Sequence, residues 1–167
     1  MNVRKTIIII LFFAGLLLMA IFEWSLIWAL GRTVSTPDLS FGRLNTTLGF
    51  LCTSAGILLI SWSVWVQYRV GKGTPAPMAA TRKLVTIGPY AYTRNPMTLG
   101  AASFYLGISF WFGSLPVTLL VLVTFGVLLT YIYFHETKEL SDRFGEEYLA
   151  YKEETPFLIP RFPTRSR

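Results

Sequence analysis

The sequence predicts an all-α integral membrane protein with four transmembrane helices, because its composition is strongly apolar and its apolar residues form four runs. Of the 167 residues, 53% are hydrophobic and only 14% are charged, whereas an average soluble domain has roughly a quarter charged residues. A single domain of this length, residues 1–167, could not bury so much apolar surface away from water. The composition excludes an ordinary soluble enzyme, a disordered chain and a nucleic-acid-binding module.

Residues 7–30 form the first predicted span, a run of apolar and small residues interrupted only by Glu23 and Ser25. At 1.5 Å per residue a helix of this length reaches about 36 Å, enough to cross a hydrocarbon core of roughly 30 Å. The run is longer than the apolar region of a cleavable signal peptide, which has about 7–15 residues. We therefore expect this span to be retained in the mature protein. Glu23 lies toward the outer side, and we expect it to pair with Arg32 or to be protonated.

The second span covers residues 48–66, and the third and fourth cover residues 98–112 and 115–134. Gly113 and Ser114 separate the last two, which predicts a tight antiparallel helical hairpin. The small residues Ser103 and Gly107 in the third span predict a close approach of its backbone to the fourth. Cys52 is the single cysteine, so no disulfide within the chain and no multi-thiolate zinc site can form, and we expect no metal.

Lysine and arginine residues are distributed very unevenly about these four spans. Of the fifteen, only Arg32 and Arg43 lie between the first and second spans, and none lies between the third and fourth. Positively charged loops stay on the cytoplasmic side of a membrane, so both termini and the loop between the second and third spans are predicted to be cytoplasmic. The tryptophans Trp24, Trp28 and Trp111 would then mark the outer interface.

The cytoplasmic segment of residues 71–96 is rich in glycine and proline. Frequent glycine and proline residues argue against a long helix and favour a loop of defined conformation with exposed backbone N–H donors. A plain linker is the alternative, but the apolar side chains of Leu84, Val85 and Tyr90 favour a packed structure. At its end, Asn95 can cap the third span, with Pro96 at the first helical position.

Residues 135–154 are predicted to form a C-terminal amphipathic cytoplasmic helix. Apolar residues recur at helical spacing, namely Leu140, Phe144, Tyr148 and Tyr151. Glu139 and Arg143 can pair on the solvated side, whereas Glu136 falls on the inward face and needs a cation or a ligand. The available cation is Arg94, at the mouth of the third span. Two interpretations stay open: Arg94 extends to lipid phosphates, or Arg94 and Glu136 face a pocket for a zwitterionic small molecule.

Two motifs in this region together resemble a known family. LVTIGPYAYTRNPMTLG, residues 84–100, followed by E-x-x-x-L-x-x-x-FGEEY, residues 136–148, is similar to the isoprenylcysteine carboxyl methyltransferases, whose superfamily also contains the phospholipid N-methyltransferases. The resemblance covers roughly residues 71–162. It implies a methyltransferase in the cytoplasmic membrane, typical of bacterial members, with S-adenosylmethionine as the cofactor. It also implies a lipophilic acceptor, either isoprenylcysteine-carboxylate-like or a phospholipid amine.

Carried over residue by residue, the resemblance implies a donor site on the cytoplasmic side. The residues that would line the donor are Lys83, Leu84, Val85, Gly88 and Tyr90. Those that would hold its polar ends are Arg94, Asn95, Pro96 and Glu136. Arg94 and Glu136 are the main candidates for the reaction centre, and His135 is a candidate base for an amine acceptor, with an interfacial side chain as the alternative.

Four positions depart from the family pattern. Asn95 stands where many members have histidine, Thr98 replaces a tyrosine, and Thr137 replaces the second acid of a Glu-Glu pair. Ile132 stands where prenylcysteine-methylating members have an arginine for the substrate carboxylate, which favours a different acceptor. The substitutions at Thr98 and Thr137 keep a second hypothesis open, a catalytically silent relative that binds lipid or a partner protein.

Overall fold

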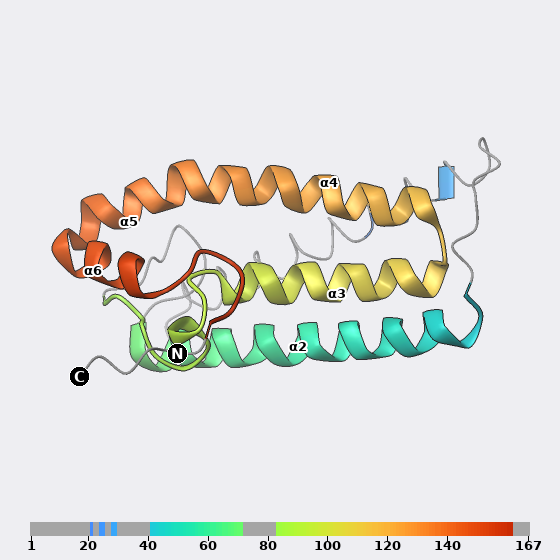
Figure 1. Ribbon diagram of the computed structural model, residues 1–167, viewed down its shortest axis with the longest axis horizontal. Coiled ribbons are helices and arrows are strands. Elements are labelled where there is room, and N and C mark those ends of the chain that lie inside the picture. Colours follow the sequence, from blue (N-terminus) through green and yellow to red (C-terminus); the bar gives the residue numbers. More distant parts are fainter. Residues whose placement is uncertain (1–20, 22–23, 26–27, 30–40, 72–82, 162–167) are drawn as a thin grey trace, which may run out of the picture.

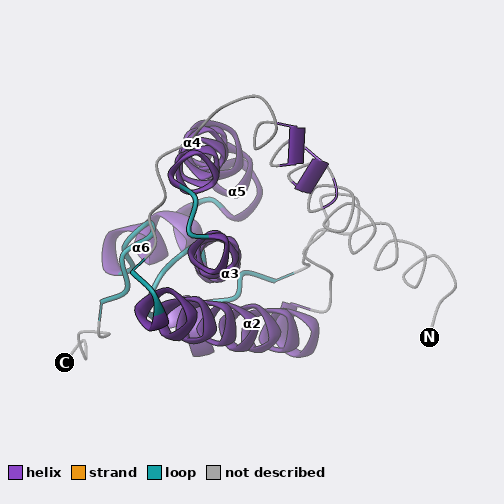
Figure 2. Cartoon of the chain, turned by 90° about the vertical axis from the view of Figure 1, so that its right-hand side faces the viewer, coloured by secondary structure: helices purple, strands orange, loops and turns teal. Residues whose placement is uncertain are grey.

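The computed structural model describes residues 21, 24–25, 28–29, 41–71 and 83–161. The first predicted span therefore lies almost entirely outside the described residues, as do Glu23 and Arg32. The described part of the chain is all-helical, as predicted. Its three long helices lie side by side, with α3 between α2 and α4 (Figures 1 and 2).

The three long helices largely follow the predicted spans. Helix α2 (Arg43–Gly71) extends past the run of residues 48–66 at both ends. Helix α3 (Pro96–Phe112) and helix α4 (Leu115–Tyr131) form the predicted tight hairpin, joined through Gly113 and Ser114. Gly113 has φ +58°, a left-handed conformation that glycine adopts without a steric penalty, and it ends α3.

The C-terminal part of the fold differs from the single continuous helix predicted for residues 135–154. A π-helical turn (Ile132–Glu136) follows α4 and leads into α5 (Thr137–Phe144), and a separate helix, α6 (Glu146–Glu154), follows. The prediction is wrong because Gly145, with φ +54° and ψ −129°, breaks the helix in a conformation open mainly to glycine. The apolar stripe still turns inward: Tyr148 and Tyr151 are buried, and Leu140 and Phe144 are half-buried.

Ser103 and Gly107 of α3 face α2 and not α4, so the partner predicted for these two small residues is wrong. The Ser103 hydroxyl donates a hydrogen bond to the Cys52 carbonyl (3.0 Å), and a Cβ atom placed on Gly107 would collide with Thr53. Helix α2 presents matching small residues there, so the two backbones can approach closely. The opposite side of α3 carries Tyr105, which packs against larger residues of α4, namely Val121 and Phe125.

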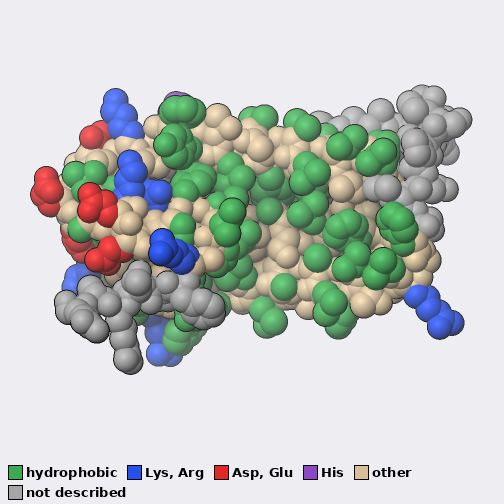
Figure 3. Space-filling view, in the orientation of Figure 1, with side chains coloured by type: hydrophobic (Ala, Val, Ile, Leu, Met, Phe, Trp, Pro, Cys, Tyr) green, Lys and Arg blue, Asp and Glu red, His purple; other side chains and the backbone are tan. Residues whose placement is uncertain are grey.

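Two helical segments are long and apolar enough to cross a membrane, Arg43–Gly71 and Leu115–Phe144. Helix α3, with 17 residues, is shorter, about 26 Å. Large apolar side chains on the outer faces are exposed, for example Leu58 on α2 (70% exposed) and Val127 on α4 (67%). Figure 3 shows hydrophobic side chains along the body of the bundle, whereas most charged side chains gather at the end that carries α5 and α6. Such extensive exposed apolar surface fits a membrane protein.

Candidate functional site

The turn before α3 is anchored against the end of α2. Residues Gly88–Ala91 form a 3₁₀ turn in which Pro89 and Tyr90 are buried. Gly88 has φ +64°, and a Cβ atom there would lie 3.0 Å from the Val66 Cγ2 atom of α2. Val66 also packs with Val85 and Tyr90 in one apolar cluster. The described part of this segment, residues 83–96, is therefore packed, as its apolar residues predicted, and is not a plain linker. Residues 72–82 of the same segment lie outside the described residues.

The start of α3 is built differently from the expected helix cap. Pro96 occupies the first turn of the helix, as predicted, but the Asn95 side chain makes no capping hydrogen bond. Its Nδ2 atom instead donates to the Phe157 carbonyl (2.9 Å). The predicted cap is wrong because a segment that follows α6 supplies an acceptor for this amide, a long-range contact with no local sequence signal.

Arg94 points its guanidinium group toward α6. Its Nη1 atom donates to the Tyr148 hydroxyl oxygen (3.3 Å), while its Nε atom is buried with no hydrogen-bond partner among the described residues. The ion pair between described residues joins Arg143 and Glu139, and no described carboxylate pairs with Arg94. A half-buried guanidinium with a buried Nε atom and no carboxylate partner among the described residues is suited to an anionic ligand group.

A chain of hydrogen bonds ties α6 through the turn to α2. The Tyr151 hydroxyl donates to the Tyr90 carbonyl (2.7 Å), and the Tyr90 hydroxyl donates to the Gln67 Oε1 atom (3.2 Å). Burial raises the pKa of Tyr151 far above its usual value of 10, and the neighbouring Tyr90 raises it further. Tyr151 is therefore a neutral phenol that keeps its proton for the Tyr90 carbonyl at physiological pH.

These elements enclose a cavity of about 80 Å³. Its walls come from the end of α2, the turn, the π-helical turn after α4, and helices α5 and α6. The lining residues are Gln67, Leu84, Val85, Tyr90, Arg94, Asn95, Ile132, Thr137, Leu140, Tyr148 and Tyr151. Arg94 is the only one of them with a formal charge at neutral pH, so the described lining mixes apolar and neutral polar side chains with one strong anion-binding group.

The matching family model identifies the class of protein that carries this cavity. Residues 44–147 match the family described as phospholipid methyltransferase. The chain belongs to the phospholipid methyltransferase family. This family is part of the superfamily that also contains the isoprenylcysteine carboxyl methyltransferases, so the resemblance seen in the sequence is confirmed. No curated protein matches the chain.

Family membership makes the chain a membrane methyltransferase with a lipid as its substrate class. The matched region contains all of α2 except its first residue, together with α3, α4 and α5. It therefore includes the turn and most of the cavity wall, and it ends just before Tyr148 of α6. The site of this phospholipid methyltransferase relative thus combines matched residues with a C-terminal part that lies beyond the match.

The structure brings five of the predicted donor-binding residues to the cavity: Leu84, Val85, Tyr90, Arg94 and Asn95. Gly88 shapes the turn and Pro96 begins α3, so both support the wall without lining it. Lys83 is exposed beside this group. The side chain of Glu136 lies outside the described part of the structure. Ile132 and Thr137, two of the departures from the family pattern, also line the cavity.

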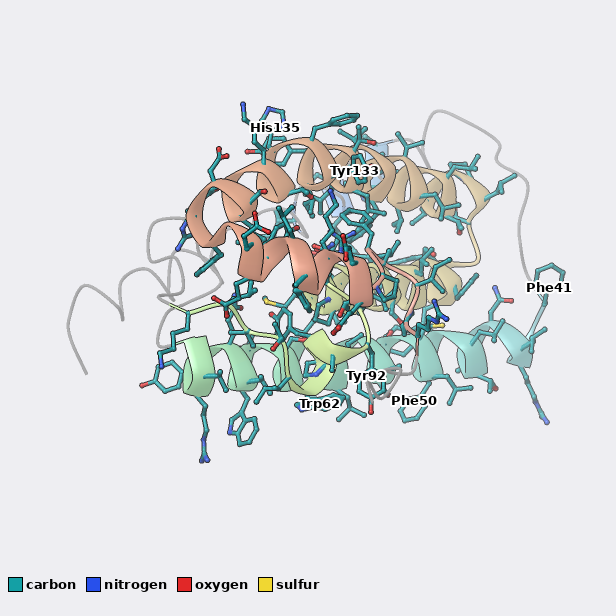
Figure 4. The ribbon with its side chains drawn as sticks, turned by 60° about the vertical axis from the view of Figure 1, so that its left-hand side comes forward. Phe41, Phe50, Trp62, Tyr92, Tyr133 and His135 are labelled. Atoms are coloured by element: carbon teal, nitrogen blue, oxygen red, sulfur yellow. The ribbon has the colours of Figure 1, made fainter. Side chains whose placement is uncertain are left out.

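His135 lies apart from the cavity. Its ring is exposed and stacks on Tyr131, with ring centroids 4.6 Å apart and nearly parallel planes. Figure 4 shows it on the outer edge of the π-helical turn, away from the turn that carries Tyr92. This position fits the interfacial alternative for His135 better than contact with a ligand in the cavity.

Gln67 is a cavity residue that the sequence analysis missed. It lies in the last turns of α2, where its side chain accepts the Tyr90 hydroxyl hydrogen bond. The one available signal was a polar amide directly after the apolar run of residues 48–66, which is also typical of an ordinary span end. Only the packing of the turn against α2 makes this residue part of the site.

Proposed function

We propose that the cavity binds S-adenosylmethionine and that the protein transfers the donor's methyl group to a lipophilic acceptor. The observation that carries the proposal is Arg94: a guanidinium in a cavity, with a buried Nε atom that has no described partner. A partly buried charge of this kind costs free energy unless an opposite charge compensates it. The carboxylate of the donor's amino-acid part is such a charge and suits the planar guanidinium.

The rest of the lining suits the other parts of this donor. Three tyrosines, Tyr90, Tyr148 and Tyr151, line the cavity, and aromatic rings attract cations such as a sulfonium or an ammonium. We propose that Glu136 holds the donor's ammonium group. The volume of about 80 Å³ lies below the roughly 300–1,000 Å³ of typical small-molecule pockets. Binding therefore requires the cavity to widen.

When bound, S-adenosylmethionine supplies an electrophilic methyl group on a positively charged sulfur. The transfer is an in-line displacement, so the contribution of the protein is alignment of donor and acceptor and exclusion of water. The apolar side chains of Ile132 and Leu140 form the part of the wall that excludes water. Since Ile132 offers no charge to an acceptor carboxylate, we propose a phospholipid amine over an isoprenylcysteine-like carboxylate.

We further propose that the cavity faces the cytoplasm. The support is the charge asymmetry of the sequence, together with the gathering of charged side chains at the end with α5 and α6 (Figure 3). Single cysteines introduced at Lys72 and Glu153 should both be protected from a membrane-impermeant reagent in intact cells. Both should react once the membrane is permeabilised. Labelling of the two positions from opposite sides would contradict this orientation.

Donor binding by two variants tests the proposed site. Arg94→Ala and Glu136→Ala should each lose about 2–5 kcal/mol of donor binding, the range for removal of one member of a buried charge pair. This loss corresponds to a roughly 30-fold to several-thousand-fold lower affinity. Titration calorimetry of the purified protein in detergent measures it directly. Glu139→Ala is the matched control, because Glu139 is exposed and pairs only with a surface arginine in the described structure.

The outcomes separate the possible roles. Unchanged donor affinity in Arg94→Ala would reject the proposed site, as expected if Arg94 only reaches lipid phosphates. Unchanged affinity in Glu136→Ala would remove Glu136 alone. Donor binding without methylation of any phospholipid amine would favour the catalytically silent relative, for which Thr137 in the cavity wall is the supporting observation.

A further inference from the structure

The segment that follows α6, residues 155–161, lies along the turn that carries Arg94; we refer to it as the C-terminal strap (Figure 1). Two backbone hydrogen bonds join it to this turn. The Arg94 amide donates to the Pro156 carbonyl (2.9 Å), and the Arg161 amide donates to the Tyr92 carbonyl (3.0 Å). The strap therefore holds the backbone at Arg94 and at Tyr92, two residues before it.

Phe157 of the strap contacts the site through both its backbone carbonyl and its ring. Its carbonyl oxygen accepts hydrogen bonds from the Thr93 hydroxyl (3.2 Å) and the Asn95 amide (2.9 Å). Its ring lies against the guanidinium group of Arg94, with the Cζ atom 5.6 Å from the ring centroid. The Phe157 ring also makes a T-shaped contact with Tyr133 of the π-helical turn, with ring centroids 5.4 Å apart.

We infer that Phe157 is a positioning residue, which holds the Arg94 guanidinium in the orientation that binds the donor carboxylate. An aromatic face attracts a guanidinium electrostatically but accepts no strong hydrogen bond from it. The contact therefore restricts the long arginine side chain and leaves available to a ligand those N–H groups, such as Nε–H, that do not bond Tyr148. A carboxylate in the same place would orient Arg94 equally well but would compete with the donor for those N–H groups.

This inference rests on the proposed function, since it concerns the same Arg94. It assigns a role to a residue outside the matched residues 44–147. It also gives a reason for the long-range contact of the strap with the turn, since Asn95 and its hydrogen-bond partner Phe157 are 62 residues apart in the sequence. Because the ring acts only through Arg94, its removal should matter only when Arg94 is present.

Phe157→Leu removes the aromatic face and keeps an apolar side chain and the backbone carbonyl. We expect a roughly 3- to 30-fold lower affinity for S-adenosylmethionine, or about 0.6–2 kcal/mol, measured by titration calorimetry on the full chain in detergent. In the Arg94→Ala background the same change should have no further effect. Ile159→Ala, in the same strap but 79% exposed, is the matched control and should bind the donor normally.

A second series covers the case in which Phe157→Leu does not fold. Fluorinated phenylalanines at position 157 keep the shape of the ring and withdraw electron density from its face, so donor affinity should fall stepwise with added fluorine. Normal affinity in Phe157→Leu or across the fluorinated series, combined with lost affinity in Arg94→Ala, would overturn the inference alone. Normal affinity in Arg94→Ala would overturn the proposed function and the inference together.

Discussion

Replacement of Gly56 by alanine should separate α2 from α3. A Cβ atom at Gly56 would lie 2.6 Å from the Gly100 carbonyl oxygen and 2.6 Å from the Phe104 amide nitrogen. Both are backbone atoms of a helix, so neither can rotate away. Ordinary contact begins near 3.4 Å, and the two helices must therefore move apart locally by about 0.8 Å. Overpacking of this kind costs about 1–3 kcal/mol.

Gly126 of α4 is the matched control, because a Cβ atom there meets nothing within 4 Å. Gly126→Ala should be neutral or stabilising by up to about 1 kcal/mol, since alanine favours a helix more than glycine does. The same gain in helix propensity acts at Gly56, so steric contact is what distinguishes the two sites. We expect the two variants to differ by about 1–3 kcal/mol in the free energy of unfolding.

Unfolding in mixed micelles, followed by circular dichroism against the fraction of denaturing detergent, measures this difference. Gly56→Ala should also bind the donor more weakly, because α2 carries Gln67 and Val66 against the turn of the site. Equal stability of the Gly56 and Gly126 variants would refute the argument that close backbone contact between α2 and α3 organises the bundle.

Two further changes test the turn and its contact with α6. Tyr151→Phe removes the hydrogen bond to the Tyr90 carbonyl and should cost about 1–2 kcal/mol. Because burial raises the pKa of Tyr151, the neutral phenol stabilises the fold fully below pH about 10, and this stabilisation is lost as the pH rises above that value. The melting temperature of the wild type should therefore fall more steeply with rising alkaline pH than that of Tyr151→Phe. Parallel falls in the two melting temperatures would contradict this. Gly88→Ala places a side chain at φ +64°, 3.0 Å from a methyl carbon of Val66, and should cost about 1–2 kcal/mol. It should also weaken donor binding in calorimetry, and wild-type values for both quantities would show that the turn tolerates a side chain.

Features set by neighbouring residues could be predicted from the sequence. Apolar runs located the long helices, Gly113 and Ser114 located the hairpin, and the recurrence of Tyr148 and Tyr151 showed which side of the C-terminal region turns inward. The pattern around Arg94 located the turn that forms the cavity and led to the family that the chain belongs to. Each of these signals arises within a few turns of helix or within one loop.

Features that depend on contacts between distant residues were decided only by the tertiary structure. The face of α3 with Ser103 and Gly107 could have packed against either α2 or α4. Only the matching surface of α2 around Gly56 decides that it packs against α2. A glycine such as Gly145 can also occur within a helix, so the sequence does not show a break there. The break is needed because α6 must turn back to place Tyr151 against Tyr90. Gln67 and Phe157 look like ordinary residues at the ends of two helical regions, and packing places them at the cavity and at Arg94. Local propensity carries no information about such contacts, because their free energy exists only once the separate segments have come together.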